Sequence, residues 1–384
     1  MKIPMVAGVA LLLVIAAISM FSSRGVASGA VALVNACADS TNRTACYENT
    51  VSALYPTHSV ADIFDIVREI RREDPSYQFC HVLAHKLGER VVAEDPEKWI
   101  DAIPLNPSDG LCSNGFIHGV VGGRFRSEVL DDKTIDTLVP EFGRACESRA
   151  NWQPSDLDRA ICYHGMGHLY DFITNADLSK ALSLCSRTVP AEMRRVCVEG
   201  VFMQIYQPLE PDDYELIAQM PIKPATTTVR AFCSRFADPM AEGACLHESW
   251  PLFRENIMRG DVQSFCSEQP DTTETDRCYE AVSSIIGRQT LGEQDHAIAA
   301  CAGFPSHRRA ECIAYSAQAT LEENRLDAAA AIALCKRASG EDALTCLNQL
   351  VDHALFIFGN DDRSYSRFCL TLPAELRTQC RDRL

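Results

Sequence analysis

Apolar residues recur along this chain at the spacing of helices rather than strands. In residues 191–207 one helical face is apolar at i, i+3 and i+4 spacing, and it carries Met193, Val196, Cys197, Val201 and Ile205. Residues 310–323 and 343–358 follow the same pattern. No comparable stretch alternates between apolar and polar residues at period two, the pattern of a half-buried strand. The sequence therefore predicts an all-α fold.

Cysteines interrupt these helical segments at a regular period. The second cysteines of successive pairs, from Cys245 to Cys380, are spaced by 33, 34, 34 and 34 residues, the period of a helix-turn-helix hairpin. Proline often lies between paired cysteines, where it suits the first turn of a helix. We therefore expect the first cysteine near the end of one helix and the second about two turns into the next helix. The pairs are Cys185/Cys197, Cys233/Cys245, Cys266/Cys278, Cys301/Cys312, Cys335/Cys346 and Cys369/Cys380.

The repeat predicts disulfide-stapled helical hairpins stacked as an α-solenoid. It resembles tetratricopeptide (TPR) arrays in repeat length and hairpin plan. Their tryptophan, glycine and tyrosine signature is missing, so we assign no family. Each staple, closing a loop of roughly 10 to 12 residues, contributes about 2 to 3 kcal/mol in the chain-entropy model. Upstream, proximity in sequence pairs Cys146 with Cys162 and Cys37 with Cys46, which leaves Cys80 for Cys112.

The N-terminal segment predicts export. Residues 3–23 are uncharged and mostly apolar, about the length needed to cross a bilayer. Small residues near position 28 suit a signal peptidase, but the apolar run is longer than usual and favours an uncleaved anchor. We therefore expect a signal peptide or signal anchor in residues 1–30, histidine-containing hairpins in 31–210 and stapled repeats in 211–384. The membrane is contacted through the N-terminal segment only.

Composition narrows the compartment and the partners. The 384 residues carry a net charge of −16, which disfavours nucleic acid and favours cations or a basic protein partner on an acidic groove. The 18 cysteines include no CxxC, which argues against thioredoxin-like redox chemistry and covalently attached c-type haem. Structural disulfides persist outside the cytoplasm, so we expect a periplasmic or secreted location.

Candidate chemistry lies in a group of histidines in the N-terminal hairpins. Two segments contain His-x-x-x-His, which on a helix places both imidazoles on one face. Counted from the preceding cysteine, positions +2 and +6 hold Asn114 and His118 in one unit and Glu199 and Met203 in another, so stacking should bring successive units together. The five histidines are His81, His85, His118, His164 and His168.

These five histidines predict a site for a transition metal ion, with Glu89 or Glu199 as carboxylate ligands. Neutral imidazole suits zinc, copper and iron alike. Five histidines exceed one tetrahedral structural zinc site, so a two-metal centre or an open catalytic position is an alternative. Glycines at +3, such as Gly115, Gly165 and Gly200, would let the helices approach closely around the site.

Other interpretations stay open at this point. Helical histidines can simply face solvent, two of them can hold non-covalent haem, and Cys80 or Cys162 would be thiolate ligands in a reducing compartment. His81 is not followed by the glutamate that a zincin uses as its general base, and no motif assigns a reaction. The second function class is a disulfide-rich helical scaffold that binds another protein along its concave face.

Overall fold

A computed structural model describes residues 26–77, 79–125, 130–291, 293–338, 340–359 and 361–383. Across these residues every regular element is a helix, apart from one isolated β-bridge between Arg149 and Trp152. The predicted all-α fold is confirmed. None of the described helices combines the length and the apolar character that a membrane span requires. The anchor predicted in residues 3–23 lies outside the described residues.

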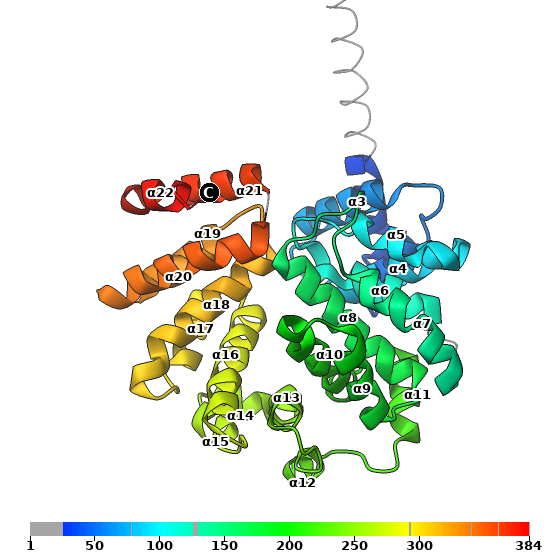
Figure 1. Cartoon of the computed structure of the whole chain (residues 1–384). Helices are drawn as coiled ribbons and strands as arrows, with labels where there is room; N and C mark the ends of the chain where they lie inside the picture. Colours follow the sequence, from blue (N-terminus) through cyan, green and yellow to red (C-terminus); the bar gives the residue numbers. More distant parts are fainter. Residues whose placement is uncertain are drawn as a thin grey trace, which may run out of the picture.

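The first half of the chain forms short hairpins and their connections (Figure 1). Residues 26–37 are helical. They are followed by α2 (Arg43–Ser52), α3 (Val60–Glu73), α4 (His81–Glu94), α5 (Trp99–Ala102), α6 (Gly115–Phe125), α7 (Asp132–Ala145), α8 (Asp156–Ile173), α9 (Leu178–Thr188), α10 (Arg194–Tyr206) and α11 (Pro211–Gln219). Turns of 3-10 helix occur at η1 (Pro96–Lys98), η2 (Ile103–Leu105), η3 (Leu111–Asn114) and η4 (Ala191–Met193).

The second half continues the same plan to the C-terminus. Its helices are α12 (Val229–Cys233), α13 (Pro239–Glu248), α14 (Arg254–Met258), α15 (Val262–Cys266), α16 (Thr272–Gln289), α17 (Gln294–Cys301), α18 (Arg309–Glu323), α19 (Ala329–Arg337), α20 (Glu341–Phe358), α21 (Asp362–Thr371) and α22 (Ala374–Arg381). The 3-10 turns here are η5 (Trp250–Phe253) and η6 (Ser306–Arg308).

All 18 cysteines form disulfides, in the nine pairs expected from the sequence. Cys185 lies in the last turn of α9 and Cys197 in the first turn of α10. In the later pairs the first cysteine again lies in the last turn of its helix, and the second lies in the first or second turn of the next helix. Pro190, Pro305 and Pro373 directly precede the helices that follow them, with φ near the value that the proline ring imposes. Each staple therefore joins the end of one helix to the start of its partner.

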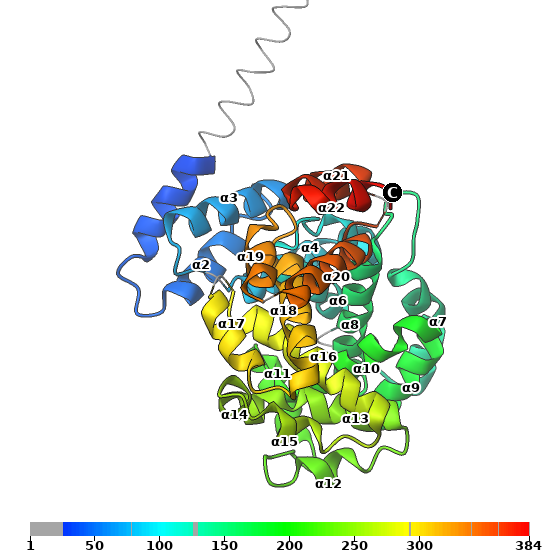
Figure 2. The same ribbon diagram turned by 90° about the vertical axis from the view of Figure 1, so that its left-hand side faces the viewer.

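The second helix of each hairpin packs on its counterpart in the next hairpin. This gives the order α2, α4, α6, α8, α10, α13, α16, α18 and α20, with α9, α12, α15, α17, α19 and α21 packed outside it. The row curves until α20 contacts α8 and α18 contacts η3 (Figure 2). Helices of the second half thus lie against α8 and against the 3-10 turn that precedes α6.

A polar clasp fastens the two halves where the row closes. Arg325, which is 5% exposed, donates from Nη1 to Oδ1 of Asp158 at 2.9 Å and to the carbonyl of Ser108 at 3.2 Å. Ser113 in η3 donates its hydroxyl to Glu323 at the end of α18. A buried arginine is stable only when its charge is paired, so these contacts fix the C-terminal hairpins on the loop that precedes α6.

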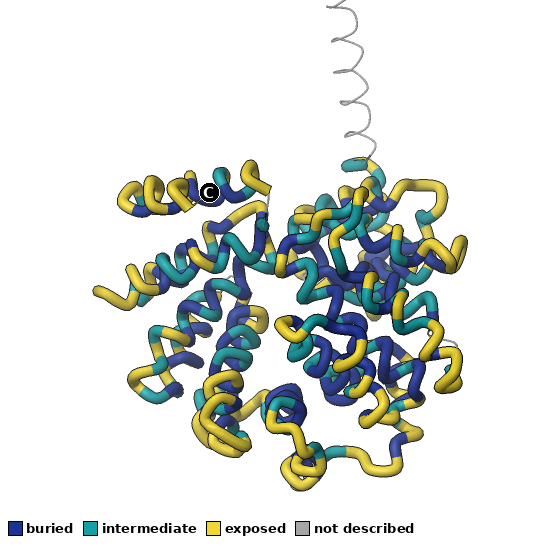
Figure 3. Tube along the Cα trace, viewed as in Figure 1, coloured by how far each residue is buried: buried dark blue, intermediate teal, exposed yellow. Residues whose placement is uncertain are grey.

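The buried apolar residues form two groups (Figure 3). The first runs from Ala30 to Leu246, and the second from Ile257 to Cys380 together with Leu157 of α8. The division between the groups therefore lies between α13 and α14. The predicted boundary at residues 210 and 211 stays a prediction about independent folding units. The helices α4, α6 and α8, which carry the five predicted histidines, contribute buried residues to the first group.

Candidate metal centre

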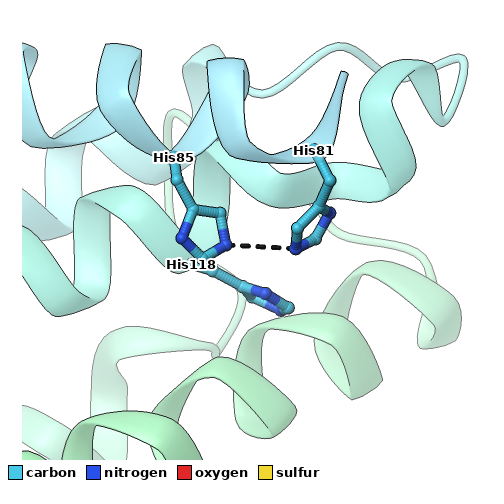
Figure 4. Close-up of side chains that lie close together, drawn as sticks. All are labelled: His81, His85 and His118. Carbon is cyan, nitrogen blue, oxygen red and sulfur yellow. Dashed lines mark hydrogen bonds between the residues drawn. The ribbon is translucent and has the colours of Figure 1, made fainter. Parts of the chain in front are cut away.

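Three imidazoles from two crossing helices meet beside each other (Figure 4). His81 and His85 lie one turn apart on α4, and His118 lies on α6. The ring centroids of His81 and His85 are 4.6 Å apart. The ring centroid of His118 lies 5.3 Å from that of His81 and 5.5 Å from that of His85. The spacing His-x-x-x-His thus places both rings of α4 on the face that meets α6.

The other two histidines adjoin the same cluster through His118. His164 and His168 lie one turn apart on α8, with centroids 5.0 Å from each other. Their rings are 5.7 Å and 5.3 Å from the ring of His118. The five histidines predicted from the sequence therefore form one continuous cluster across α4, α6 and α8, with His118 at its centre.

Fixed acceptors hold the Nδ1 side of several of these rings. His81 Nδ1 lies 3.1 Å from the carbonyl oxygen of Cys112, and His164 Nδ1 lies 3.1 Å from that of Val196. His168 Nδ1 lies 2.7 Å from Oε1 of Gln204 on α10. Because these oxygens only accept, a neutral ring carries its proton on Nδ1 and leaves the lone pair on Nε2. Metal-binding histidines are commonly oriented in this way.

The Nε2 side of the rings has the spacing of a coordination shell. His81 Nε2 and His85 Nε2 are 3.1 Å apart, and one nitrogen from each of His81, His85 and His118 lies within 4.8 Å of the others. Ligands about 2.0 to 2.1 Å from a tetrahedral metal are about 3.3 to 3.4 Å from one another. Small rotations of the three side chains would therefore bring them to the distances of a common ion.

Two further nitrogens of the cluster have no partner among the described residues. Nε2 of His118 and Nε2 of His168 are both buried, and neither has a hydrogen-bond partner there. A buried polar atom without a partner costs on the order of 1 to 3 kcal/mol. The Nε2 atom of His164 lies 3.0 Å from the thioether sulfur of Met203 on α10. The cluster thus presents nitrogen lone pairs and one soft sulfur ligand beside it.

Glycines at the helix crossings allow this proximity. A Cβ at Gly115 would lie 2.5 Å from the carbonyl oxygen of His81, and one at Gly200 would lie 2.1 Å from that of His164. A Cβ at Gly165 would lie 2.9 Å from the ring of His118. Each of these three glycines stands three residues after a cysteine and faces a histidine of the helix that precedes its own in the packed row. Close packing around the histidines is therefore encoded at the same repeat position.

A left-handed run supports His81. Cys112, Ser113 and Asn114 have φ values of 57°, 50° and 57°, a region that non-glycine residues rarely adopt. Cys112 is joined to Cys80, the N-cap of α4, and its carbonyl accepts the hydrogen bond from His81. Such backbone strain persists where the surrounding structure fixes it, and it concentrates at functional sites. Here it aims a carbonyl group at a cluster histidine.

The environment favours the neutral form of four of the five imidazoles. Burial lowers the pKa of His81 to about 4, with a further contribution from His168, while the Cys112 carbonyl opposes the shift. Burial also lowers the pKa of His118 well below its ordinary value, and a charge on any of the other four histidines lowers it further. The pKa values of His164 and His168 are lowered by burial as well. Neutral imidazole is the form that binds a metal.

Neither of the two predicted carboxylates belongs to this three-histidine group. Glu89, one turn beyond His85 on α4, lies against Gly123 of α6. Glu199 of α10 accepts from Arg195 and faces His247 instead. Sequence reasoning missed Glu210, whose Oε1 lies 3.9 Å from His85 Nδ1, and Gln204. Glu210 lies in the connection that precedes α11, where the sequence shows no repeat. Met203, in contrast, stands six residues after a cysteine, at one of the two repeat positions expected to line the site.

Cysteine is excluded from the ligand set. Cys80 and Cys162 flank the histidines in sequence, but each is bonded to another cysteine, Cys112 and Cys146 respectively. A disulfide sulfur carries no thiolate, so the interpretation in which cysteines bind zinc is wrong.

Comparison with protein-family models, curated proteins and solved structures gives no match for this chain.

Proposed function

We propose that this protein binds a transition metal ion through His81, His85 and His118, with His164 and His168 beside them as further ligands. The observation that carries the proposal is the meeting of three imidazole nitrogens within 4.8 Å of one another, from two helices. The orientation of His81 by a backbone carbonyl and the lowered pKa values of the cluster support it.

The nine disulfides indicate an oxidising, extracytoplasmic compartment. We propose that residues 1–30 export the chain and hold it at the membrane as a signal anchor. The metal site then faces the periplasm or the exterior, where zinc, copper and iron are all candidates because imidazole binds each of them.

Three histidines leave one position of a tetrahedral ion open. Catalytic zinc sites share this arrangement, whereas structural sites are closed by four protein ligands. The open position would admit water or a substrate, so metalloenzyme chemistry is compatible with the proposal. The proposal itself concerns binding, since Asp171, the acid nearest in sequence to His168, has no partner that assigns it a role.

Metal analysis of the full-length oxidised protein tests the proposal. Protein purified from an export compartment without a histidine tag should retain about one equivalent of metal or more after removal of adventitious ions. Replacing His81 and His85 together by alanine should remove most of it, because two of the three converging nitrogens disappear. The matched control is His296→Ala, since His296 is exposed on α17.

Either of two results would contradict metal binding. The first is less than roughly a tenth of an equivalent in the wild-type protein, far below the whole ion that a protein site holds. The second is equal loss of metal in the His81/His85 variant and in His296→Ala. Circular dichroism of both variants would show whether the helical fold survives the substitutions.

A second candidate function is supported by the charge of the chain. We propose as the alternative that the stapled repeats form a scaffold for a basic protein partner, because the net charge of −16 favours such a partner. Binding of this kind should weaken steeply with added salt and persist after chelation. Loss of binding on chelation would assign the interaction to the metal site instead.

A further inference from the structure

A second group of metal-ligating side chains lies along α10 from the five-histidine cluster. It consists of Glu199 on α10 with His247 and Glu248 on α13. One atom from each lies within 4.8 Å of the other two, and none of the three belongs to the group of His81, His85 and His118. We propose that these three residues form a second, independent site for a divalent metal ion.

The distances in this group differ from those of a strong ion pair. His247 Nε2 lies 3.3 Å from Glu248 Oε1 and 3.5 Å from Glu199 Oε1. Charge-assisted hydrogen bonds between nitrogen and carboxylate are about 2.7 to 2.9 Å long. Ligands of a tetrahedral ion held by bonds of about 2.0 to 2.1 Å are separated by about 3.3 to 3.4 Å. A common ion therefore accounts for both separations.

The group is largely buried and carries excess negative charge. The side chains of Glu199, His247 and Glu248 are 20%, 2% and 10% exposed, and that of the neighbouring Glu274 is 6% exposed. Arg195 is the guanidinium in contact with the group, and it donates to both Glu199 and Glu274. Three carboxylates against one guanidinium leave two negative charges, which one divalent cation neutralises. Buried charges are otherwise costly.

The remaining contacts resemble a supporting shell. Arg195 donates through Nε to Glu199 Oε1 at 2.8 Å, and Gln207 donates through Nε2 to Glu248 Oε2 at 3.0 Å. These donors fix the orientation of both carboxylates. Arg195 does so through Glu199 Oε1, the oxygen that also lies 3.5 Å from His247 Nε2. The oxygen Glu248 Oε1 is left to face His247. Both carboxylates are thus held while the imidazole Nε2 lies between them.

A proton is the competitor of the metal at this site. Burial opposes a charge on His247, but Glu248 and Glu199 outweigh it and raise the pKa of the imidazole. A protonated His247 would neutralise one of the two excess charges, whereas a divalent ion neutralises both. Two carboxylates and one imidazole suit zinc, iron(II) or manganese(II) and provide no soft ligand for copper(I).

Zinc titration of the full-length oxidised protein tests the second site separately from the first. The background variant is His81→Ala/His85→Ala/His118→Ala, which removes the three converging histidines of the first candidate centre and leaves His164 and His168 in place. We expect equilibrium dialysis against Zn²⁺ to leave about one bound equivalent in this background. Adding Glu248→Gln, which keeps the shape of the side chain and removes its charge, should weaken the remaining binding at least tenfold. Glu242→Gln on the same helix is the matched control and should leave it unchanged.

The nitrogen NMR signal of His247 gives a measurement that leaves the residues of the second site unsubstituted. In the triple-alanine background, Zn²⁺ should shift its Nε2 resonance to the range of metal-bound imidazole. If the background variant binds no zinc and the His247 signal stays that of imidazolium, the group is a buried ion pair and the second site is refuted. Failure of the first centre alone would leave zinc bound to wild-type protein and sensitive to Glu248→Gln, so the two proposals fail independently.

Discussion

Acid should destabilise this protein through its partly buried histidines at pH values where the carboxylates of Asp74 and Glu322 are still charged. Burial lowers the pKa of His81 to about 4 in the folded protein, against an ordinary value of 6.5. Between these values the unfolded chain binds a proton that the folded protein rejects. The free energy of unfolding therefore falls as the pH decreases below 6.5 and levels off below 4.

The size of the effect follows from the two pKa values. One pKa unit corresponds to about 1.4 kcal/mol, so the full contribution of His81 is about 3 kcal/mol. Between pH 7 and pH 5 the linkage relation gives a loss of about 2 kcal/mol for this residue alone. The pKa values of His118, His164 and His168 are lowered as well, so the loss for the whole cluster is larger.

Guanidinium chloride unfolding of the metal-free, disulfide-intact protein at pH 7 and pH 5 measures this loss. His81→Gln removes the titrating ring and keeps a side-chain N–H for the Cys112 carbonyl, so its loss should be about 2 kcal/mol smaller. Asp74 and Glu322, whose pKa values are lowered to about 2, stay charged over this range and do not contribute. His296→Gln should behave like the wild-type protein because this histidine is exposed.

An identical pH dependence in His81→Gln and the wild-type protein would refute the reasoning. It would mean that the His81 ring is solvated or already charged in the folded state. The inference that the converging imidazoles are neutral in the folded protein would then lose its main support.

Two further substitutions test the packing around the cluster. Gly200→Ala places a Cβ 2.1 Å from the His164 carbonyl and should cost about 1 to 3 kcal/mol of unfolding free energy, whereas Gly143→Ala, in ordinary contact with Thr188, should cost nothing by denaturant titration. Asp171 is fully buried, and neither carboxylate oxygen has a partner among the described residues, so burial raises its pKa well above 3.8. Its contribution to stability falls as the pH rises from 3.8 toward the raised pKa. Asp171→Asn should therefore gain stability relative to the wild-type protein as the pH rises above 3.8, and a difference that does not change with pH would contradict this.

The sequence by itself determined the helices, their pairing and the location of the histidines. Helical periodicity is a local property, so residues 191–207, 310–323 and 343–358 were placed to within a few residues of η4 with α10, α18 and α20. Pairing each cysteine with its neighbour in the sequence was enough to predict the disulfides that close short loops, such as Cys185–Cys197. The two cysteines then left, Cys80 and Cys112, form the remaining pair. The spacing of His81 and His85 already put both rings on one helical face.

Only the tertiary structure decided which side chains share a site. The turn of each hairpin and the curvature of the row bring Glu210 to His85 and Met203 to His164, and they place Glu199 beside His247 rather than beside the five histidines. The orientation of His81 depends on a backbone carbonyl in a run of residues with left-handed backbone conformation. No pattern of residues in the sequence predicts this conformation. Periodicity specifies the face of a helix, but ligand geometry depends on how separate helices cross, and that is set by packing contacts between distant parts of the chain.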